Sequence, residues 1–172
     1  TVGTVDAFSF SGCKALQTVT LAEGVQSVGA YAFHWCTSLR EICLPDSVQE
    51  IGNHAFAYCK SLKHVRLSTG MTRISNTAFS GCESLQCVEI PDSVTEIATQ
   101  AFQDCVALEQ LEIPASVQKI GEGVFDGCVN LQQLSILNPD CEIFDLETTI
   151  SSAARIRGMS VSTAHEYASK YE

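Results

Sequence analysis

The sequence predicts a solenoid, in which short coils stack on one another and share one apolar interior. Phenylalanine recurs at a spacing of 23 residues with no slip in register, a cysteine follows each phenylalanine three positions later, and a leucine follows each cysteine three positions later. One such unit cannot bury its apolar face alone, so a fixed period of this size indicates stacked repeats. The columns are Phe10, Phe33, Phe56, Phe79, Phe102 and Phe125; Cys13, Cys36, Cys59, Cys82, Cys105 and Cys128; and Leu16, Leu39, Leu62, Leu85, Leu108 and Leu131.

Each repeat divides into short elements. In Leu39-x-x-Ile42-x-Leu44 the last three positions alternate inward and outward, which is the periodicity of a half-buried strand. Pro45-Asp46-Ser47 then predicts a turn, and Val48-x-x-Ile51 begins a second short strand that glycine follows in several repeats. The Ala-Phe-x-x-Cys segment has room for one helical turn only, so we expect a 3₁₀ turn or a single α turn there. Equivalent strands of successive coils should pair in parallel.

This 23-residue pattern resembles the BspA-like (Treponema-type) class of leucine-rich repeats, over residues 1–144. The resemblance implies a leucine-rich-repeat solenoid with parallel strands on a concave face, where such proteins meet their partners. Three repeats depart from the pattern: Ser75 and Ala98 replace the glycine, Val124 replaces the alanine before Phe125, and Ser68-Thr69-Gly70 replaces the proline turn. These departures bear on individual bends of the coil.

Residues 145–172 resemble the closing segment of the same proteins, through Gly158, Ser162, Ala164, Tyr167 and Ala168. We expect a short helix that runs to about Lys170 and covers the end of the solenoid. Either Ser162 or Thr163 is suited to be its N-cap, and Thr163-x-x-Glu166 fits a capping box. At the other end, Val2, Val5 and Phe10 lie in register with the repeat, so we expect the chain to open in mid-repeat, with further coils upstream in a longer protein.

Composition and charge exclude several classes of partner. The net charge of −10 argues against nucleic acid and anionic membranes, which bind through clustered Lys and Arg. No stretch approaches the roughly twenty apolar residues of a membrane span. Charge is segregated along the chain: four basic residues and no acidic ones lie between Lys60 and Arg73, whereas thirteen acidic residues and only Lys119 lie between Glu83 and Glu147. This pattern serves solubility, or it steers a partner that carries a basic patch.

The nine cysteines do not form a small-protein disulfide framework or a zinc site, since no C-x-x-C pair is present. Adjacent cysteines of the column could lie within the Cα distance of a disulfide, yet free cysteine usually behaves in a core as a small hydrophobe. We therefore expect buried thiols. Such a chain suits a reducing or anaerobic setting, whereas the family resemblance implies a secreted or surface-attached protein.

The outward side chains of the main strands are the candidate binding residues: Arg40, Glu41, Lys63, His64, Arg66, Glu89, Glu109 and Glu112. One column among the outward positions reads Glu41, His64, Cys87, which superficially suggests a carboxylate, a base and a thiol nucleophile. An open sheet offers neither an oxyanion hole nor a water-excluded pocket, so we predict no catalytic residue. The four histidines do not converge on a metal site, and no motif predicts a cofactor.

Aromatic residues outside the phenylalanine column cluster in the second and third repeats, where Tyr31, Trp35 and Tyr58 form a candidate aromatic patch with His34 and His54. Trp35 and Tyr58 occupy equivalent positions, so we expect them to stack. Half-buried packing and an interface anchor are both open interpretations. The concave face lacks aromatic platforms, which argues against carbohydrate binding there and leaves Trp35 and Tyr58 as the place for it.

The resemblance implies a non-enzymatic recognition module that binds a protein partner, for example an extracellular-matrix or host surface protein, as surface adhesins do. Two alternatives stay open: an accessory module that positions an enzyme domain elsewhere in a longer chain, and a structural spacer without a ligand.

Overall fold

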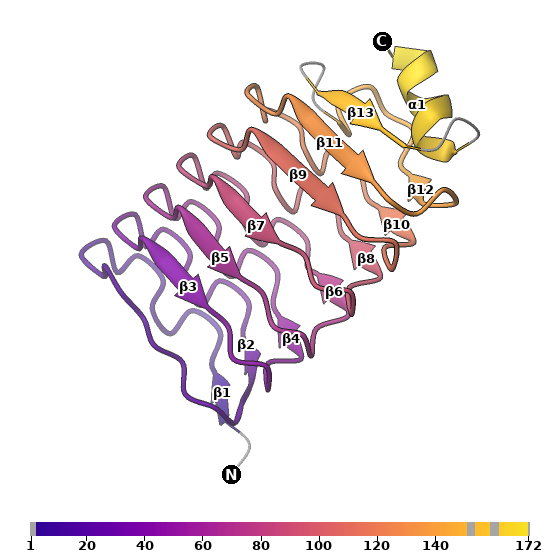
Figure 1. The fold of residues 1–172 in the computed structure, drawn as a ribbon. Helices are drawn as coiled ribbons and strands as arrows, with labels where there is room; N and C mark the ends of the chain where they lie inside the picture. Colours follow the sequence, from indigo (N-terminus) through magenta and orange to yellow (C-terminus); the bar gives the residue numbers. More distant parts are fainter. Residues whose placement is uncertain (1–2, 151–153, 159–161, 172) are drawn as a thin grey trace.

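The computed structural model describes residues 3–150, 154–158 and 162–171, so Val2 lies outside the described residues. The chain forms a solenoid of parallel strands, as the repeat predicts, with one short helix at its C-terminal end (Figure 1). Each full coil contributes one strand to a front ladder and one shorter strand to a second ladder behind it.

The front ladder carries the main strands, which pair in parallel with the register of the repeat, as in Ile42 opposite Val65 and Val65 opposite Val88. The first coil joins it only through the bridge between Thr18 and Glu41. Its pairing is interrupted between β7 and β9, so the ladder consists of two three-stranded sheets and not of one continuous sheet as identical coils would give. The strands are β3 (Glu41–Cys43), β5 (His64–Arg66), β7 (Cys87–Glu89), β9 (Gln110–Ile113), β11 (Gln133–Ile136) and β13 (Arg155–Arg157).

The second ladder is interrupted at a different place, between β4 and β6. A Cβ built on Gly52 would lie 2.3 Å from the backbone nitrogen of Ala30, so this close approach of two coils requires glycine. Ser75 stands at the equivalent position after β6 and carries a Cβ. The Cβ of Ser75 does not by itself explain the interruption. Ala98 also replaces the glycine, and its N–H still donates to the Ile74 carbonyl of the preceding coil at 2.9 Å. The strands are β1 (Gly3–Val5), β2 (Val25–Val28), β4 (Glu50–Ile51), β6 (Arg73–Ile74), β8 (Glu96–Ile97), β10 (Lys119–Ile120) and β12 (Glu142–Ile143).

The turn without proline keeps the geometry of the others. The Met71 N–H donates to the Ser68 carbonyl at 3.3 Å, as the Val94 N–H donates to the Pro91 carbonyl at 3.0 Å. The Ser68 hydroxyl also donates to the Val48 carbonyl of the preceding coil at 2.5 Å. Side-chain hydrogen bonding therefore does at this turn what the fixed φ of proline does elsewhere.

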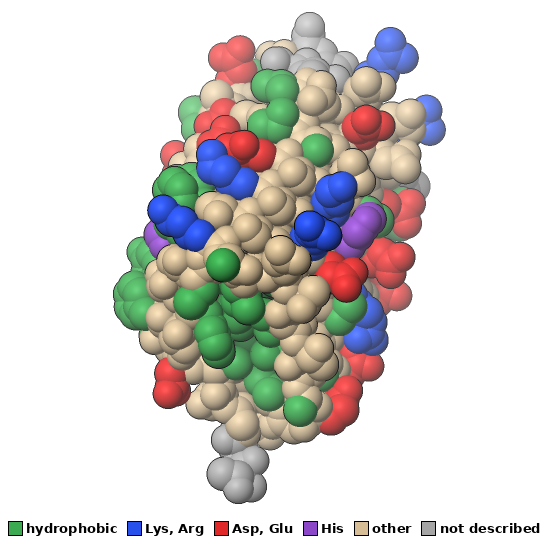
Figure 2. Space-filling view, turned by 90° about the vertical axis from the view of Figure 1, so that its left-hand side faces the viewer, with side chains coloured by type: hydrophobic (Ala, Val, Ile, Leu, Met, Phe, Trp, Pro, Cys, Tyr) green, Lys and Arg blue, Asp and Glu red, His purple; other side chains and the backbone are tan. Residues whose placement is uncertain are grey.

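The phenylalanine column forms a continuous stack through the centre of the solenoid. Ring centroids are 5.1 Å apart between Phe10 and Phe33 and 6.0 Å apart between Phe102 and Phe125, with nearly parallel planes throughout. All are fully buried except Phe10, which is 42% exposed because no described coil covers it. Figure 2 views the molecule from the side of the first coils, where hydrophobic side chains are visible at the surface.

The cysteine column has a hydrogen-bonding role that the spacing alone does not reveal. Each buried thiol of the column donates to the carbonyl of the phenylalanine 26 positions earlier, as Cys59 does to Phe33 at 3.2 Å and Cys82 to Phe56 at 3.3 Å. The prediction that all six columnar cysteines point inward is wrong for Cys13, which is exposed in the uncovered first coil. The nine thiols are free, and burial raises the pKa of Cys82 to about 12.

The Ala-Phe-x-x-Cys segment contains the local hydrogen bonds of a 3₁₀ turn, such as His34 N–H to the Tyr31 carbonyl. Alternate N–H groups instead donate to the next coil, as Trp35 does to Ala57 at 2.9 Å. Two positions per repeat have a positive φ, which stops the turn from continuing as a helix. One column consists of Phe8, Tyr31, His54, Thr77, Gln100 and Gly123, and the other of Gly12, Trp35, Tyr58, Gly81, Asp104 and Gly127.

The helix α1 (Thr163–Tyr171) closes the C-terminal end, as predicted. Ser162 is its N-cap, since its hydroxyl accepts the His165 N–H at 3.1 Å. The predicted capping box of Thr163 and Glu166 does not form, because Thr163 is the first helical residue and its hydroxyl donates to the Cys141 carbonyl. The closing segment also contributes β13, which pairs with β11 and extends the front ladder.

Candidate functional site

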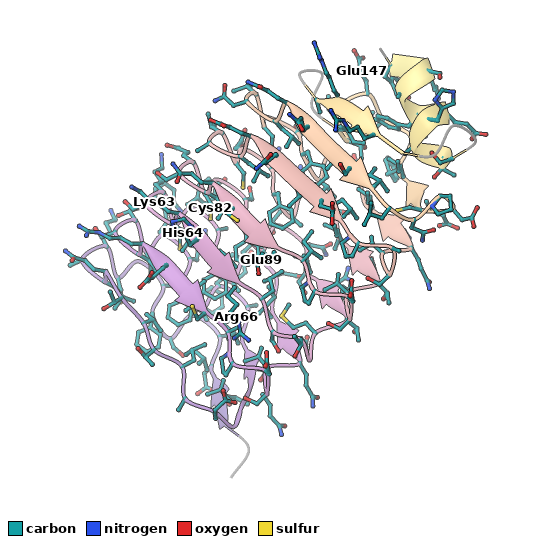
Figure 3. The ribbon with its side chains drawn as sticks, viewed as in Figure 1. Lys63, His64, Arg66, Cys82, Glu89 and Glu147 are labelled. Carbon is teal, nitrogen blue, oxygen red and sulfur yellow. The ribbon has the colours of Figure 1, made fainter. Side chains whose placement is uncertain are left out.

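The candidate site is the concave surface, defined as the outward side chains of the front ladder and of the residue before each strand. In Figure 3, Lys63, His64 and Arg66 project from β5 and its start, and Glu89 projects from β7. Every concave residue predicted from the sequence is exposed: Arg40, Glu41, Lys63, His64, Arg66, Glu89, Glu109 and Glu112. Their backbone is held by the paired strands, because inward residues such as Val65 and Leu111 anchor each strand in the core.

Charge on the concave surface changes sign twice along the solenoid. Arg40, Lys63 and Arg66 lie in its first half, and Glu109 and Glu112 follow at the position of β9. At the C-terminal end β13 adds Arg155 and Arg157, which are exposed and lie opposite Gln133 and Ser135 of β11. The 23-residue pattern does not identify these two arginines because they fall outside its register, although the alternation in Arg155-Ile156-Arg157 is a strand signal.

Ion pairs between coils neutralise part of the basic segment. The Lys60 ammonium lies 2.7 Å from Glu83, and Arg73 lies 3.1 Å from Glu96. Arg66 lies 3.2 Å from Asp46, whose pKa the Thr69 N–H holds below its ordinary value with help from the guanidinium. The separation of basic and acidic residues along the sequence is therefore smaller in the folded chain, because basic and acidic side chains of neighbouring coils form pairs.

A shallow hollow of about 370 Å³ lies on the concave surface where the pairing of the front ladder is interrupted. Cys87, Gln110 and Glu112 line it, and the buried side chains of Val88 and Leu111 form its floor. The hollow is open to solvent, so it suits a side chain of a bound protein better than an enclosed small molecule.

The row of Glu41, His64 and Cys87 is real in space, since the three residues are cross-strand neighbours on β3, β5 and β7. All three side chains are exposed, and within the described residues no hydrogen bond joins them. The described part of the chain also contains no group of three or more His, Cys, Asp or Glu placed to hold a metal ion. Nor does any helix in it have the length and apolarity to cross a membrane.

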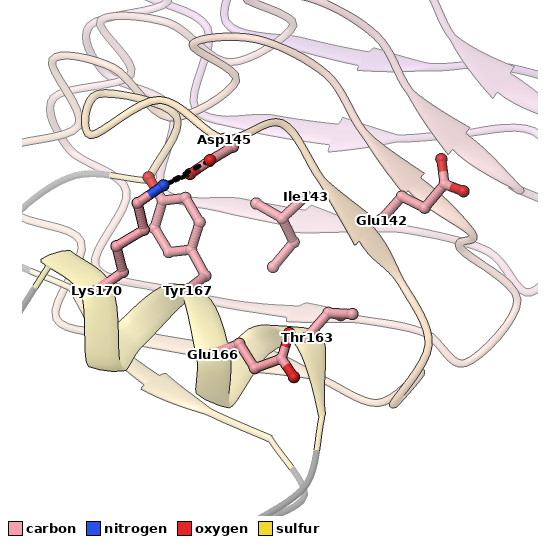
Figure 4. Close-up of a pocket in the computed structure, with 7 residues that line it drawn as sticks. All are labelled: Glu142, Ile143, Asp145, Thr163, Glu166, Tyr167 and Lys170. Carbon is pink, nitrogen blue, oxygen red and sulfur yellow. Dashed lines mark hydrogen bonds and ion pairs between the residues drawn. The ribbon is translucent and has the colours of Figure 1, made fainter.

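A second hollow, of about 340 Å³, lies between α1 and β12 (Figure 4). Several of the residues that line it hold α1 against the segment that follows β12. Lys170 forms an ion pair with Asp145 at 2.5 Å, and the Tyr167 hydroxyl donates to the Leu146 carbonyl at 2.6 Å while it accepts the Ile150 N–H at 3.2 Å. We assign this hollow to the cap and not to ligand binding.

The aromatic patch lies on the turn segments, away from the front ladder. Trp35 and Tyr58 stack as predicted, with centroids 4.9 Å apart, and Tyr31 stacks between Phe8 and His54. His34 contacts both stacks edge-on. Figure 2 shows hydrophobic side chains gathered along its left-hand flank, with a histidine beside them.

The backbone of the patch is strained. Trp35 and Tyr58 have φ values of 59° and 60°, in a column that holds glycine in three other coils. The left-handed conformation costs a residue other than glycine about 1–2 kcal/mol. The same conformation occurs in coils outside the patch, at Thr77, Gln100 and Asp104, so it is a property of the repeat.

Comparison with known proteins places the repeat in a family. The BspA type leucine rich repeat region matches residues 1–109 and 49–149, in six copies. A crystal structure of a leucine-rich repeat protein from Bacteroides ovatus is 32% identical over 82% of this chain and 42% of its own, with a TM-score of 0.69. A leucine rich cell surface protein from Faecalibacterium prausnitzii is 33% identical over 75% of this chain and 32% of its own, with a TM-score of 0.65.

The chain thus spans less than half the length of these two structures. A T. pallidum leucine rich repeat protein, 24% identical over 87% of this chain and 79% of its own, has the same fold, with a TM-score of 0.54. No curated protein matches. The repeat spacing, the strand ladders and the match along most of the chain agree, and the protein belongs to the BspA-type leucine-rich repeat family.

Proposed function

We propose that the chain is a non-enzymatic protein-recognition module of a cell-surface or secreted protein, and that its concave surface binds a protein partner. The observation that carries the proposal is a ladder of paired strands that holds a wide row of exposed, chemically varied side chains around a hollow that is open to solvent. Such a surface can contact many residues of a folded partner at once. The cell-surface protein among the similar structures supports the location.

The acidic residues in the middle of the concave surface favour a partner that carries a basic patch. Glu89, Glu109 and Glu112 are exposed, and Glu112 lies on the rim of the hollow at β7 and β9. A partner that presents a basic patch would associate faster and in one register on this surface. Because the side chains are exposed, this contribution should weaken as salt is added.

A charge-matched pair of variants tests the proposal against purified matrix proteins, with immobilised fibronectin and fibrinogen as the probes. Glu89→Gln, Glu109→Gln and Glu112→Gln together should reduce the association rate at least tenfold at low salt. Asp92→Asn, Glu122→Gln and Asp140→Asn change the net charge equally but lie off the front ladder, and should leave the rate within twofold. Equal losses in the two triple variants, or binding that is the same at 0.05 and 0.5 M salt, would overturn the proposal.

A further inference from the structure

We propose that the face of Trp35 turned toward Gly12 is a stacking platform for a pyranose ring of a glycan. This site lies on the turn segments, apart from the concave surface, and so goes beyond the proposed protein-recognition role. The structure points to it through an aromatic stack that is closed at one end and open at the other.

The closed end is at Tyr58. A Cβ built on Gly81, the next residue of the column, would lie 2.5 Å from Cδ1 of the Tyr58 ring, so this ring packs directly against the backbone of the following coil. Tyr58 in turn covers one face of Trp35. Both rings are held in place, although Trp35 is 39% and Tyr58 37% exposed.

The open end is at Trp35. The preceding residue of the column is Gly12, and a Cβ built there would meet nothing within 4 Å. Because Gly12 has no side chain, the space that a third ring of this column would fill, one coil before Trp35, is open. A flat ligand can fill it at the ring spacing of 4.9 Å that Trp35 and Tyr58 already have.

The surroundings of this place favour a sugar ring over other flat groups. Phe8, which is 60% exposed, lies on the same coil as Gly12, and the side chains of Ser11 and Lys14 beside it are exposed. The C–H bonds on one side of a pyranose carry a partial positive charge and suit the negative face of an indole. Its hydroxyl groups can bond to the polar rim, a combination of apolar and polar contacts that is typical of small-ligand sites.

Charge argues against a cationic ligand in the same position, despite the net charge of −10. The turn segments of the first three coils, residues 7–16, 30–40 and 53–63, contain no Asp or Glu. The ionic residues within these segments are basic and include Lys14 and Lys60, of which Lys60 is paired with Glu83 of the following coil. A guanidinium or ammonium stacked on Trp35 would find no counter-charge there, whereas a neutral or acidic sugar meets no repulsion.

Trp35 is the only tryptophan of the chain, so its fluorescence reports directly on the platform. Titration with chitotriose, lactose and sialyllactose should change the emission of the intact protein in a saturable way for at least one of them. Gly12→Tyr should place a ring over the open face and weaken that binding at least tenfold. Gly12 has a φ of 74°, and the column accepts Trp35 and Tyr58 at 59° and 60°, so the backbone can take this variant at a cost of about 1–2 kcal/mol. Unfolding in urea verifies that it folds.

Calorimetry extends the test to variants without the reporter. Trp35→Gly should lose binding at least tenfold, whereas Phe144→Ala, which removes an exposed ring elsewhere, should bind as the parent does. The concave triple glutamine variant should also bind sugar normally, which separates this proposal from the recognition role. Three outcomes would overturn it: no response to any of the sugars, unchanged binding in Gly12→Tyr, or a response to N-acetyl-arginine amide in place of sugars.

Discussion

Replacement of Phe79 by alanine is the most direct test of the shared interior. Phe79 is fully buried, and its ring lies between Phe56 at 5.5 Å and Phe102 at 5.6 Å. Removal of a buried phenylalanine side chain costs about 3–5 kcal/mol, from lost burial and from the cavity that stays behind. In a solenoid this loss weakens the contacts with both neighbouring coils.

Phe10→Ala is the matched control, because Phe10 belongs to the same column and stacks on one ring only. With 42% of Phe10 exposed, the loss should fall to roughly half of the value for Phe79. Urea unfolding, followed by circular dichroism and by the fluorescence of Trp35, gives both free energies of unfolding. Equal losses for Phe79→Ala and Phe10→Ala, or a loss below about 1 kcal/mol for Phe79→Ala, would refute the interpretation of the column as one continuous core.

Three further predictions concern thiols, pH and the cap. Cys13, Cys43 and Cys87 are exposed, so a thiol reagent at pH 8 should label three cysteines quickly and the buried ones only on unfolding; fast labelling of Cys82, whose pKa burial raises to about 12, would contradict this. Burial lowers the pKa of His34 and His54, with a further contribution from His54 at His34, so the unfolded chain binds these protons more readily and stability should fall as pH drops below about 6.5. The urea midpoint at pH 7.5 and 5.0 measures this, and a His34→Phe/His54→Phe variant with undiminished sensitivity would show that other groups are responsible. Tyr167→Phe removes the hydroxyl that bonds to Leu146, Glu147 and Ile150 at the cap, and should cost about 1–3 kcal/mol. Faster hydrogen exchange at Ile150 is the expected sign, and exchange equal to that of the parent protein would place the stabilisation of the cap elsewhere.

The fold could be predicted from the sequence because its signal is repeated. A substitution such as Ser75 for glycine does not obscure the pattern, because the phenylalanine, cysteine and leucine columns each recur six times. The same argument predicted the stacking of Trp35 on Tyr58, since a period converts equal sequence position into spatial adjacency.

Features that depend on backbone detail within a coil could not be predicted in this way. The positive φ of Trp35 has no signal in the residue itself, because an aromatic residue does not favour that conformation; only the glycines at the equivalent positions 12, 81 and 127 indicate it. The acceptor of the Cys59 thiol is a carbonyl of the preceding coil, which the spacing of side chains does not identify. Ion pairs such as Lys60 with Glu83 depend on side-chain rotamers, which the repeat period does not determine. Arg155 and Arg157 extend the concave surface through a strand that lies outside the repeat.

The front ladder and the second ladder are interrupted at different junctions between coils, and this difference bears on where the solenoid can bend. Between β7 and β9 the strands of the front ladder do not pair, so the backbone hydrogen bonds between these two coils lie in the second ladder, through β8 and β10, and in the turn segments, as from the Phe102 N–H to the Val124 carbonyl. A change of angle at this junction would disturb the contact of side chains such as Val88 and Leu111 but break no main-chain bond in front. The coils up to β7 and the coils from β9 onward are therefore not joined by main-chain bonds on the concave side, and we expect a small change of the angle between them to fit the concave surface to partners of different curvature.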